Sequence, residues 1–300
     1  MTNTSMQKII AIVGPTASGK SDLAVAVARQ VNGEIISTDS RQIYRGLDLG
    51  TGKITKKEMC GIPHHLLDIA SPKRQISVVG YEKLATRAVR DIIKRGKVPI
   101  LCGGTGLYTD AILNNLSFPT AKPNKALRQT LAKYSPKELF EQLKKLDPIR
   151  AETIEPTNPH RLIRAIEIAT ELGSVPPLVA PTPRYHALII GIAVSREKLA
   201  ERIELRLHSR MRKGMLAEIR HLHKEGLSWK RMEELGLEYR FLAQFLQKKI
   251  TRDEMLRDLA TAIRHYAKRQ MVWFKRNKAI KWFPFEEQAK IMKEVRAFLE

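Results

Sequence analysis

The feature that most constrains the fold of this chain is an eight-residue segment near its beginning. The segment follows Ile9 to Val13, a continuous β-branched apolar run ended by glycine, which is typical of a strand buried on both faces of a parallel sheet. It matches the pattern GxxxxGK[ST] and leads into a helical pattern from Asp22 to Gln30. Its residues are Gly14, Pro15, Thr16, Ala17, Ser18, Gly19, Lys20 and Ser21. This context predicts a phosphate-binding loop.

Each residue type in the loop has a physical role in holding a phosphate group. Glycines let successive backbone N–H groups point inward around an oxyanion, and the helix dipole adds about half a positive charge. Lys20 would neutralise terminal phosphate oxygens, and the Ser21 hydroxyl would reach Mg²⁺. The alternative is a chance match in a glycine-rich turn, which the flanking strand and helix disfavour. The motif leaves open which phosphate compound is bound.

Strand and helix patterns alternate along the first hundred residues. After the loop and its helix come a strand at Glu34–Ser37, a long helix from about Ser77 to Arg95, and a third strand at Val98–Cys102. Alternation of this kind predicts the α/β class with right-handed crossovers. We expect a P-loop NTPase-like core, in which a parallel sheet is flanked by helices.

The pattern changes between residues 117 and 184, where helical segments are separated by prolines. This stretch ends in a proline-rich run from Pro176 to Pro183, which is typical of a stiff linker. We therefore expect a mostly helical insertion domain at 117–184. The remaining residues, 1–116 and 185–300, are expected to form the catalytic core with its C-terminal helices.

The sheet is expected to resume after the insertion. The apolar run from His186 to Val194 predicts another core strand, and Ser195 is placed to cap the following helix. That helix carries three arginines at a spacing of four residues: Arg202, Arg206 and Arg210. Thr251 and Glu254 predict a capping box for a late helix, and Ala279–Phe283 predicts a last short strand.

Asp39 is the candidate for the chemical centre. Phosphate loops of ATP and GTP users usually pair with a strand that ends in Asp, but the third strand here leads into Gly103–Gly106 without a carboxylate. Asp39 follows the second strand, and the carboxyl ends of parallel strands line the ligand crevice. We expect Asp39 to face the phosphate loop. The alternative is a local role in a turn or at a helix N-cap.

The net charge of +22 and the pI near 10.1 favour a polyanion as partner, although charge alone does not decide this. A segment from Arg264 to Lys281 has no acidic residue and interleaves cations with aromatic residues. Its cations would neutralise phosphates while its aromatic rings stack on unpaired bases. Alternatively, rings such as Trp273 and Phe274 form the core face of an amphipathic helix.

Several other site classes are disfavoured. Cys60 and Cys102 lie too far apart for a CxxC zinc or redox motif, and His64 and His65 have no further cluster to support metal binding. These histidines are expected to be structural or to line a substrate pocket. No apolar run reaches the roughly 20 residues that cross a bilayer, and the opening segment lacks signal-peptide features. A cytoplasmic protein without a membrane partner is expected.

At this point the motifs resemble the tRNA dimethylallyltransferases, the tRNA isopentenyltransferase family. The resemblance runs in order from about Ile9 to Phe283 and rests on the phosphate loop and on seven further segments: Asp39–Gly46, Pro63–Leu66 with Asp68, Gly103–Tyr108, Asp147–Ala151, Asn158–Arg161, Arg164–Glu167 and Lys268–Phe274. Two segments depart from the usual pattern. Leu235–Arg240 stands where the family more often shows Gly-Tyr-Arg, and Thr51–Ile54 replaces Thr-Ala-Lys-Pro.

The resemblance implies an alkyl transfer. The dimethylallyl group of dimethylallyl diphosphate would move to the exocyclic amine of the adenine 3′ of the anticodon in tRNA, releasing diphosphate. A loop without the usual Asp on the third strand suits a diphosphate leaving group. The adenine must be extruded from the anticodon loop to react, and its amine is a poor nucleophile, so a general base is needed.

Roles for individual residues follow from this chemistry and from the resemblance. Asp39, Lys20 and Thr105 are the expected catalytic residues, and Arg206 joins the phosphate loop in binding diphosphate, with a solvated helix face as its alternative. Ser21 is the expected Mg²⁺ ligand. The expected tRNA-binding residues, beside Asp39 and Thr105, are Ser40, Arg41, Gln42, His160, Arg161, Leu162, Ile163, Arg164, Arg240, Lys268 and Arg269.

Other functions stay open at this stage. An adenylate isopentenyltransferase acting on free AMP or ATP would share the loop and Asp39, but it has less need of the charge and of the helical insertion. A P-loop kinase of a small metabolite and, more distantly, a non-enzymatic RNA-binding protein are further alternatives. A monomer that binds tRNA through the anticodon stem-loop, with dimethylallyl diphosphate as its second substrate, is expected.

Overall fold

The computed structural model describes residues 6–177 and 181–300. The proline-rich linker expected at 176–183 therefore lies partly outside the described residues, as does the start of the expected core domain. The chain divides into two compact units. Unit 1 comprises Met1–Asn115 and Pro183–Glu300, and unit 2 comprises Leu116–Thr182.

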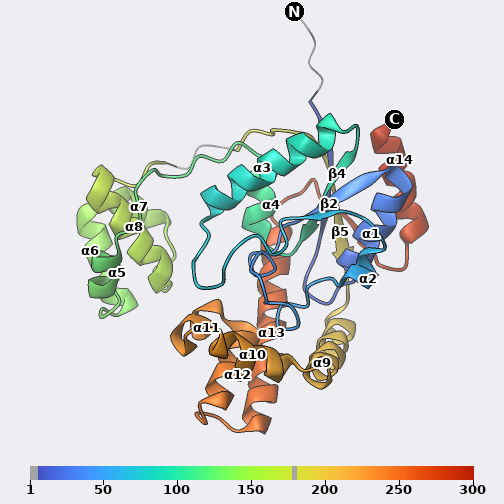
Figure 1. The fold of residues 1–300 in the computed structure, drawn as a ribbon. Helices are drawn as coiled ribbons and strands as arrows, with labels where there is room; N and C mark the ends of the chain where they lie inside the picture. The colour runs from blue at the N-terminus through green and yellow to red at the C-terminus, as the bar shows by residue number, and fades with distance from the viewer. Residues whose placement is uncertain (1–5, 178–180) are drawn as a thin grey trace, which may run out of the picture. The chain divides into compact units, whose positions relative to one another are not determined.

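Unit 1 is built on a six-stranded sheet in the order β3-β2-β4-β1-β5-β6 (Figure 1). All of its strand pairs are parallel. The strands are β1 (Lys8–Val13), β2 (Gly33–Ser37), β3 (His64–His65), β4 (Val98–Gly103), β5 (His186–Ala193) and β6 (Lys281–Pro284). The predicted α/β class with a parallel sheet is confirmed. Only β3 was not predicted, because a two-residue strand has no periodicity to detect.

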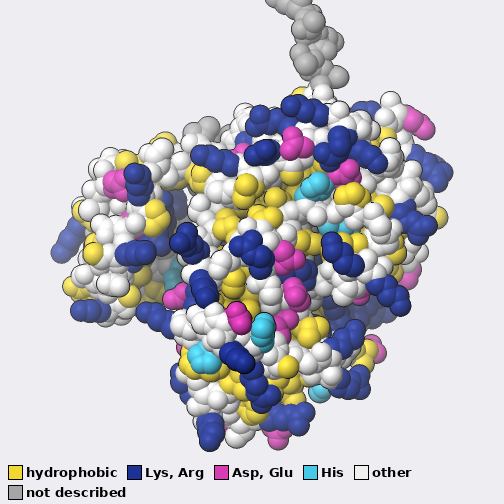
Figure 2. All heavy atoms as spheres, viewed as in Figure 1, with side chains coloured by type: hydrophobic (Ala, Val, Ile, Leu, Met, Phe, Trp, Pro, Cys, Tyr) yellow, Lys and Arg dark blue, Asp and Glu magenta, His cyan; other side chains and the backbone are white. Residues whose placement is uncertain are grey.

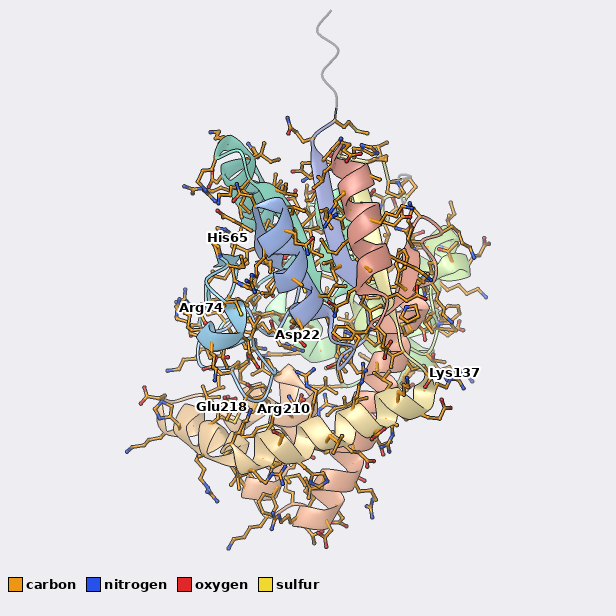
Figure 3. All side chains as sticks on the ribbon, turned by 90° about the vertical axis from the view of Figure 1, so that its right-hand side faces the viewer. Asp22, His65, Arg74, Lys137, Arg210 and Glu218 are labelled. Carbon is orange, nitrogen blue, oxygen red and sulfur yellow. The ribbon has the colours of Figure 1, made fainter. Side chains whose placement is uncertain are left out.

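Helices cover both faces of this sheet, which explains the continuous apolar runs of β1 and β5. One face packs against α1 (Lys20–Val31) and α14 (Gln288–Leu299), which lie side by side in Figure 3. The other face packs against α3 (Val78–Lys94), α4 (Gly106–Leu113) and α13 (Arg252–Phe274). The remaining helices of unit 1 are α2 (Lys56–Met59), α9 (Arg196–Arg212), α10 (Met215–Lys224), α11 (Trp229–Leu235) and α12 (Leu237–Leu246).

The predicted helix starts agree with the side-chain hydrogen bonds. The Ser195 side chain accepts a hydrogen bond from the N–H of Lys198 at the start of α9. At the start of α13, Thr251 and Glu254 form both bonds of the predicted capping box. Such caps satisfy N–H groups that have no partner within the helix. Local sequence therefore sets where the two longest helices after β5 begin.

Unit 2 is a small helical domain with a core of its own. Its helices are α5 (Lys125–Leu131), α6 (Pro136–Leu146), α7 (Pro148–Thr153) and α8 (Pro159–Leu172). Three of them begin with proline directly after a capping side chain, supplied by Ser135, Asp147 and Asn158. Proline suits the first helical position because it has no N–H to leave unpaired. No helix in the described part of the chain is long and apolar enough to cross a membrane.

Candidate active site

The phosphate loop lies between β1 and α1 and is shaped by tight backbone contacts. Gly19 has φ +91°, and a Cβ there would lie 2.8 Å from the Phe285 ring. At Gly14 a Cβ would lie 3.2 Å from the Ser18 hydroxyl oxygen. That hydroxyl is buried and has no hydrogen-bond partner among the described residues. A buried donor without a partner is costly unless a ligand satisfies it, so the loop is suited to an anion.

Lys20 is the cation of this loop. Its Nζ donates to the carbonyl oxygen of Pro15 at 3.0 Å. Burial lowers its pKa, and the negative charge of Asp39 opposes that shift. A buried ammonium that makes one neutral hydrogen bond lacks full charge compensation. A bound anion would supply the missing charge.

Asp39 lies after β2 and lines a cavity of about 510 Å³ together with Thr16, Ala17 and Lys20. Its Oδ1 accepts hydrogen bonds from the backbone N–H groups of Arg41 at 2.8 Å and Gln42 at 3.3 Å. The turn role is therefore present, and Asp39 nevertheless shares a cavity with the loop, as expected. Its Oδ2 has no hydrogen-bond partner among the described residues and is free to accept a proton.

Thr105 occupies the N-cap position of α4 without a side-chain capping bond, and it contacts the wall of the cavity through Ser40. Its Oγ1 accepts from the Ser40 N–H at 3.1 Å and donates to the Ser40 Oγ at 3.3 Å. Burial raises the pKa of Tyr266. Ser40 and Tyr266 line the cavity, whereas Thr105 is not among its lining residues. Thr105 thus holds the wall of the cavity next to Asp39.

The three arginines of α9 have different partners. Arg202 donates to the Ser18 carbonyl at 3.4 Å and lies 3.9 Å from Glu286, whereas Arg210 is ion-paired with Glu238 at 2.8 Å. Arg206 has no hydrogen bond or ion pair within the described residues. It lines the Asp39 cavity and a second one of about 540 Å³, and Lys20 lines both as well. Arg206 is therefore a free cation beside the phosphate loop, and it is exposed, as a residue on a solvated helix face would be.

Gln270 is a functional residue that the sequence did not single out. It is 5% exposed, and its Oε1 accepts from the Thr16 N–H at 2.8 Å. Its Nε2 donates to the Gly104 carbonyl at 2.9 Å. Gln270 thus ties the phosphate loop to the loop after β4. It belongs to the Lys268–Phe274 segment of the resemblance, but nothing in its sequence context predicts that it is buried between two loops.

The expected RNA-binding residues fall into two groups. In unit 1, Ser40, Arg41, Gln42, Arg240 and Arg269 line the Asp39 cavity, and Lys268 is exposed on α13. Lys and Arg side chains are widespread on the face drawn in Figure 2. Most of the excess positive charge belongs to unit 1.

In unit 2, His160 and Arg161 are exposed on α8, but Leu162 is fully buried and Ile163 packs against the same core. The prediction that the Leu162 side chain contacts RNA is therefore wrong, because every third or fourth residue of this amphipathic helix points into the core. Arg164 pairs with Glu167 and donates to the Ala121 carbonyl at 2.8 Å. The separate domain at 117–184 that contacts tRNA stays a prediction.

The structure also bears on two other sequence hypotheses. Phe274 is 3% exposed and belongs to the core, whereas Trp273 is partly buried against that core and its indole N–H donates to Asp110 at 2.8 Å. His65 bonds to Glu34 at 2.7 Å across β3 and β2. Among the described residues there is no group of three or more His, Cys, Asp or Glu side chains that could hold a metal ion.

Fold and loop together define the class of this protein: a phosphate-loop α/β protein in which the anion-binding loop and a carboxylate line one cavity. Comparison with solved structures gives closely similar folds. A tRNA isopentenylpyrophosphate transferase from Bacillus halodurans matches with a TM-score of 0.75 and 35% identity, over 98% of this chain and 97% of that one. A eukaryotic dimethylallyltransferase acting on tRNA matches with a TM-score of 0.77 and 25% identity, over 97% and 77%.

Sequence comparisons agree with the structural ones. The IPP transferase family model matches residues 42–277. A tRNA dimethylallyltransferase of Anoxybacillus flavithermus is 39% identical, covering 98% of this chain and 95% of the relative. The tRNA dimethylallyltransferase 1 of Geotalea uraniireducens is 43% identical, covering 89% and 88%. The chain therefore belongs to the IPP transferase family, and the resemblance inferred from its motifs is confirmed.

Proposed function

We propose that this enzyme transfers the dimethylallyl group from dimethylallyl diphosphate to the exocyclic amine of the adenine 3′ of the anticodon in tRNA. The observation that carries the proposal is one cavity lined by Lys20, the free Arg206 and Asp39. Cations for a leaving diphosphate and an acceptor for a proton thus border the same space. The relatives at about 40% identity over most of the chain bear the name of this activity.

The diphosphate binds in the phosphate loop. Lys20, Arg206, the backbone N–H groups of the loop and the unpartnered Ser18 hydroxyl donate to its oxygens. Negative charge on these oxygens grows as the bond to the dimethylallyl carbon breaks. Donors that are already in place then stabilise the transition state more than the ground state.

Mg²⁺ suits the donor set at the start of α1. Ser21 lines the second cavity beside Lys20. In phosphate-loop sites, Mg²⁺ is held by one Ser or Thr hydroxyl together with substrate phosphate oxygens and water. Ser21 is the residue that would hold it, and the ion would supply further neutralisation of the diphosphate.

Asp39 accepts the proton that the amine must lose. The exocyclic nitrogen attacks the first carbon of the dimethylallyl group, the carbon–oxygen bond breaks, and diphosphate leaves with the bonding electrons. One N–H proton of the amine passes to Oδ2 of Asp39. Oδ1 keeps its two backbone hydrogen bonds throughout and so holds the carboxylate in place. Thr105, through its hydrogen bonds to Ser40, fixes the wall beside it.

tRNA is the acceptor that the charge favours. An adenine in a folded anticodon loop must be extruded at a cost of a few kcal/mol, which contacts elsewhere on the RNA must offset. Exposed cations are available for these contacts on both units, Lys268 and Arg269 on α13 and Arg161 on α8, where His160 is also exposed. A free nucleotide needs no such surface.

The test is transfer from labelled dimethylallyl diphosphate to a tRNA with adenine 3′ of the anticodon. AMP, ATP and the same tRNA with guanine at that position are the parallel acceptors. We expect label on the adenine-containing tRNA alone. Label on AMP or ATP would identify a free-nucleotide transferase instead. ATP hydrolysis without any transfer would favour a kinase.

A further inference from the structure

A loop between β2 and α2 forms a wall shared by both cavities. Gly50, Thr51 and Gly52 line the Asp39 cavity, while Asp48, Leu49 and Gly52 line the second one. We call residues 48–52 the wall loop. It contains neither helix nor strand, so its position depends on contacts from other elements.

Glu218 of α10 holds the backbone N–H groups of the wall loop. Its Oε2 accepts from Asp48 at 3.2 Å and from Leu49 at 2.6 Å, and its Oε1 accepts from Gly50 at 3.0 Å. The Tyr239 hydroxyl donates to Oε1 at 2.8 Å. Burial and the nearby carboxylate raise the pKa of Tyr239, so it remains a donor. One carboxylate thereby engages three consecutive amides.

Arg210 of α9 holds the carbonyl groups of the same residues. Its Nη1 donates to the Leu49 and Gly50 oxygens at 3.1 Å each, and its Nη2 pairs with Glu238. Arg210 and Glu218 lie near one another in Figure 3, where α9 and α10 approach the wall loop. The loop is therefore held by its N–H groups and its C=O groups at once.

The wall loop in turn limits where Arg206 lies. A Cβ at Gly52 would be 3.1 Å from Nη2 of Arg206, so the guanidinium rests against the loop backbone. Arg206 has no hydrogen bond or ion pair of its own within the described residues. Its guanidinium therefore packs against the backbone of Gly52, on the same cavity walls as Lys20.

We propose that Glu218 is a positioning residue: by holding the wall loop through three backbone amides, it places Arg206 for the diphosphate of the prenyl donor. Glu218 touches no substrate. Its loss lets the wall loop shift, and a displacement of about 1 Å at a charged binding group costs up to 10²-fold in rate. The loss weakens binding of the prenyl donor, because Arg206 faces the phosphate loop that holds its diphosphate. The inference rests on the proposed function for the identity of the donor.

The test compares Glu218→Gln with Glu233→Gln in the full-length protein. The amide at position 218 presents an NH₂ group to backbone donors and cannot accept from all three. The Glu233 side chain accepts from Lys249 and Gln247, away from the wall loop, so Glu233 is the matched control. We expect Glu218→Gln to raise the KM for dimethylallyl diphosphate about tenfold, with the KM for tRNA within twofold of the parent.

Binding of inorganic pyrophosphate, measured by calorimetry, keeps this inference separate from the proposed function. Weaker pyrophosphate binding in Glu218→Gln, with Glu233→Gln unchanged, supports the positioning role even if no prenyl transfer is found. Equal pyrophosphate affinity in both variants overturns it, as does a parallel rise in both KM values. If Glu218→Gln does not fold, Gly52→Ala probes the same wall, and an unchanged pyrophosphate affinity there overturns the proposal.

Discussion

The Glu167 network of unit 2 and the phosphate-loop site of unit 1 differ in how completely their polar groups are bonded. In unit 2 the Glu167 side chain is 1% exposed and fully bonded: Arg128 donates at 2.8 and 2.7 Å, the Asn124 N–H donates at 2.5 Å, and Arg164 completes the set. In unit 1 the Ser18 hydroxyl and Arg206 have no partner within the described residues, and Lys20 bonds only a neutral carbonyl. A satisfied network stabilises a fold, whereas unsatisfied donors around a cavity are suited to a ligand.

The pKa of Glu167 shows how complete the network in unit 2 is. Burial alone would raise it, yet the hydrogen bonds from Arg128, Arg164 and Asn124 lower it to about 2. The pKa of Lys20 is lowered instead, because burial outweighs its favourable neighbours. The comparison teaches that the charge of Glu167 is balanced by its neighbours, while the positive charge of the phosphate-loop site in unit 1 is suited to an external anion.

The largest expected effect is on tRNA affinity, and it tests which of the two units contacts the RNA. tRNA binding that uses about 6 to 10 phosphate contacts should weaken by roughly 10³ to 10⁵ between 50 and 200 mM salt. Lys268→Gln in unit 1 and Arg161→Gln in unit 2 should each reduce the salt slope by about 1, if each contacts one phosphate. Filter binding across a salt series measures this, with Lys293→Gln on α14 as control. If tRNA affinity did not change with salt, the excess positive charge would not serve RNA binding.

The second prediction separates the role of Asp39 as a general base from its role in the turn. Asp39→Asn keeps an Oδ1 that accepts from Arg41 and Gln42 but removes the basic carboxylate. We expect kcat to fall about 10² to 10⁴-fold with tRNA affinity nearly unchanged. Single-turnover kinetics and tRNA binding at one salt concentration measure both. A nearly active variant would show that Asp39 serves only the turn.

A third variant breaks the balanced network of unit 2. Glu167→Gln leaves two arginines facing an amide, which should cost about 3 kcal/mol of the free energy of unfolding of this unit. Urea unfolding followed by limited proteolysis reports on unit 2 separately. Glu171→Gln, on the exposed side of the same helix, is the control. An unchanged midpoint would mean that the network contributes little.

The same network sets a pH dependence of stability. Because the folded pKa of Glu167 lies at about 2, below its ordinary 4.5, its contribution is complete above 4.5 and is lost as the pH falls toward 2. The parent protein should therefore lose stability over this range, and Glu167→Gln should lose less. Equal acid sensitivity in the two proteins would contradict the assignment.

The smallest expected effect concerns Lys20. Its lowered pKa predicts that kcat/KM for the prenyl donor declines on the alkaline side at a pH below the ordinary lysine value of 10.5. Loss of the ammonium removes charge that the diphosphate needs. The pH profile of kcat/KM measures it because this ratio reports groups of the free enzyme. Full activity up to pH 10.5 would contradict a lowered pKa of Lys20 in the free enzyme.

Local sequence determined much of this protein. The apolar run before the GxxxxGK[ST] motif predicted β1, the loop and α1, and the caps at Ser195 and Thr251 predicted where α9 and α13 begin. These features depend on neighbouring residues, so a sequence pattern contains the whole signal. Asp39 was also identified, because the carboxyl ends of parallel strands share one edge of a sheet.

Only the tertiary structure decided which side chains meet. Gln270 bridges two loops more than 160 residues before it, and Glu218 holds a loop some 170 residues away. It also decided that Leu162 and Phe274 belong to cores. Secondary structure follows from local sterics and hydrogen bonding, whereas partners distant in sequence are selected by packing, which no local pattern records.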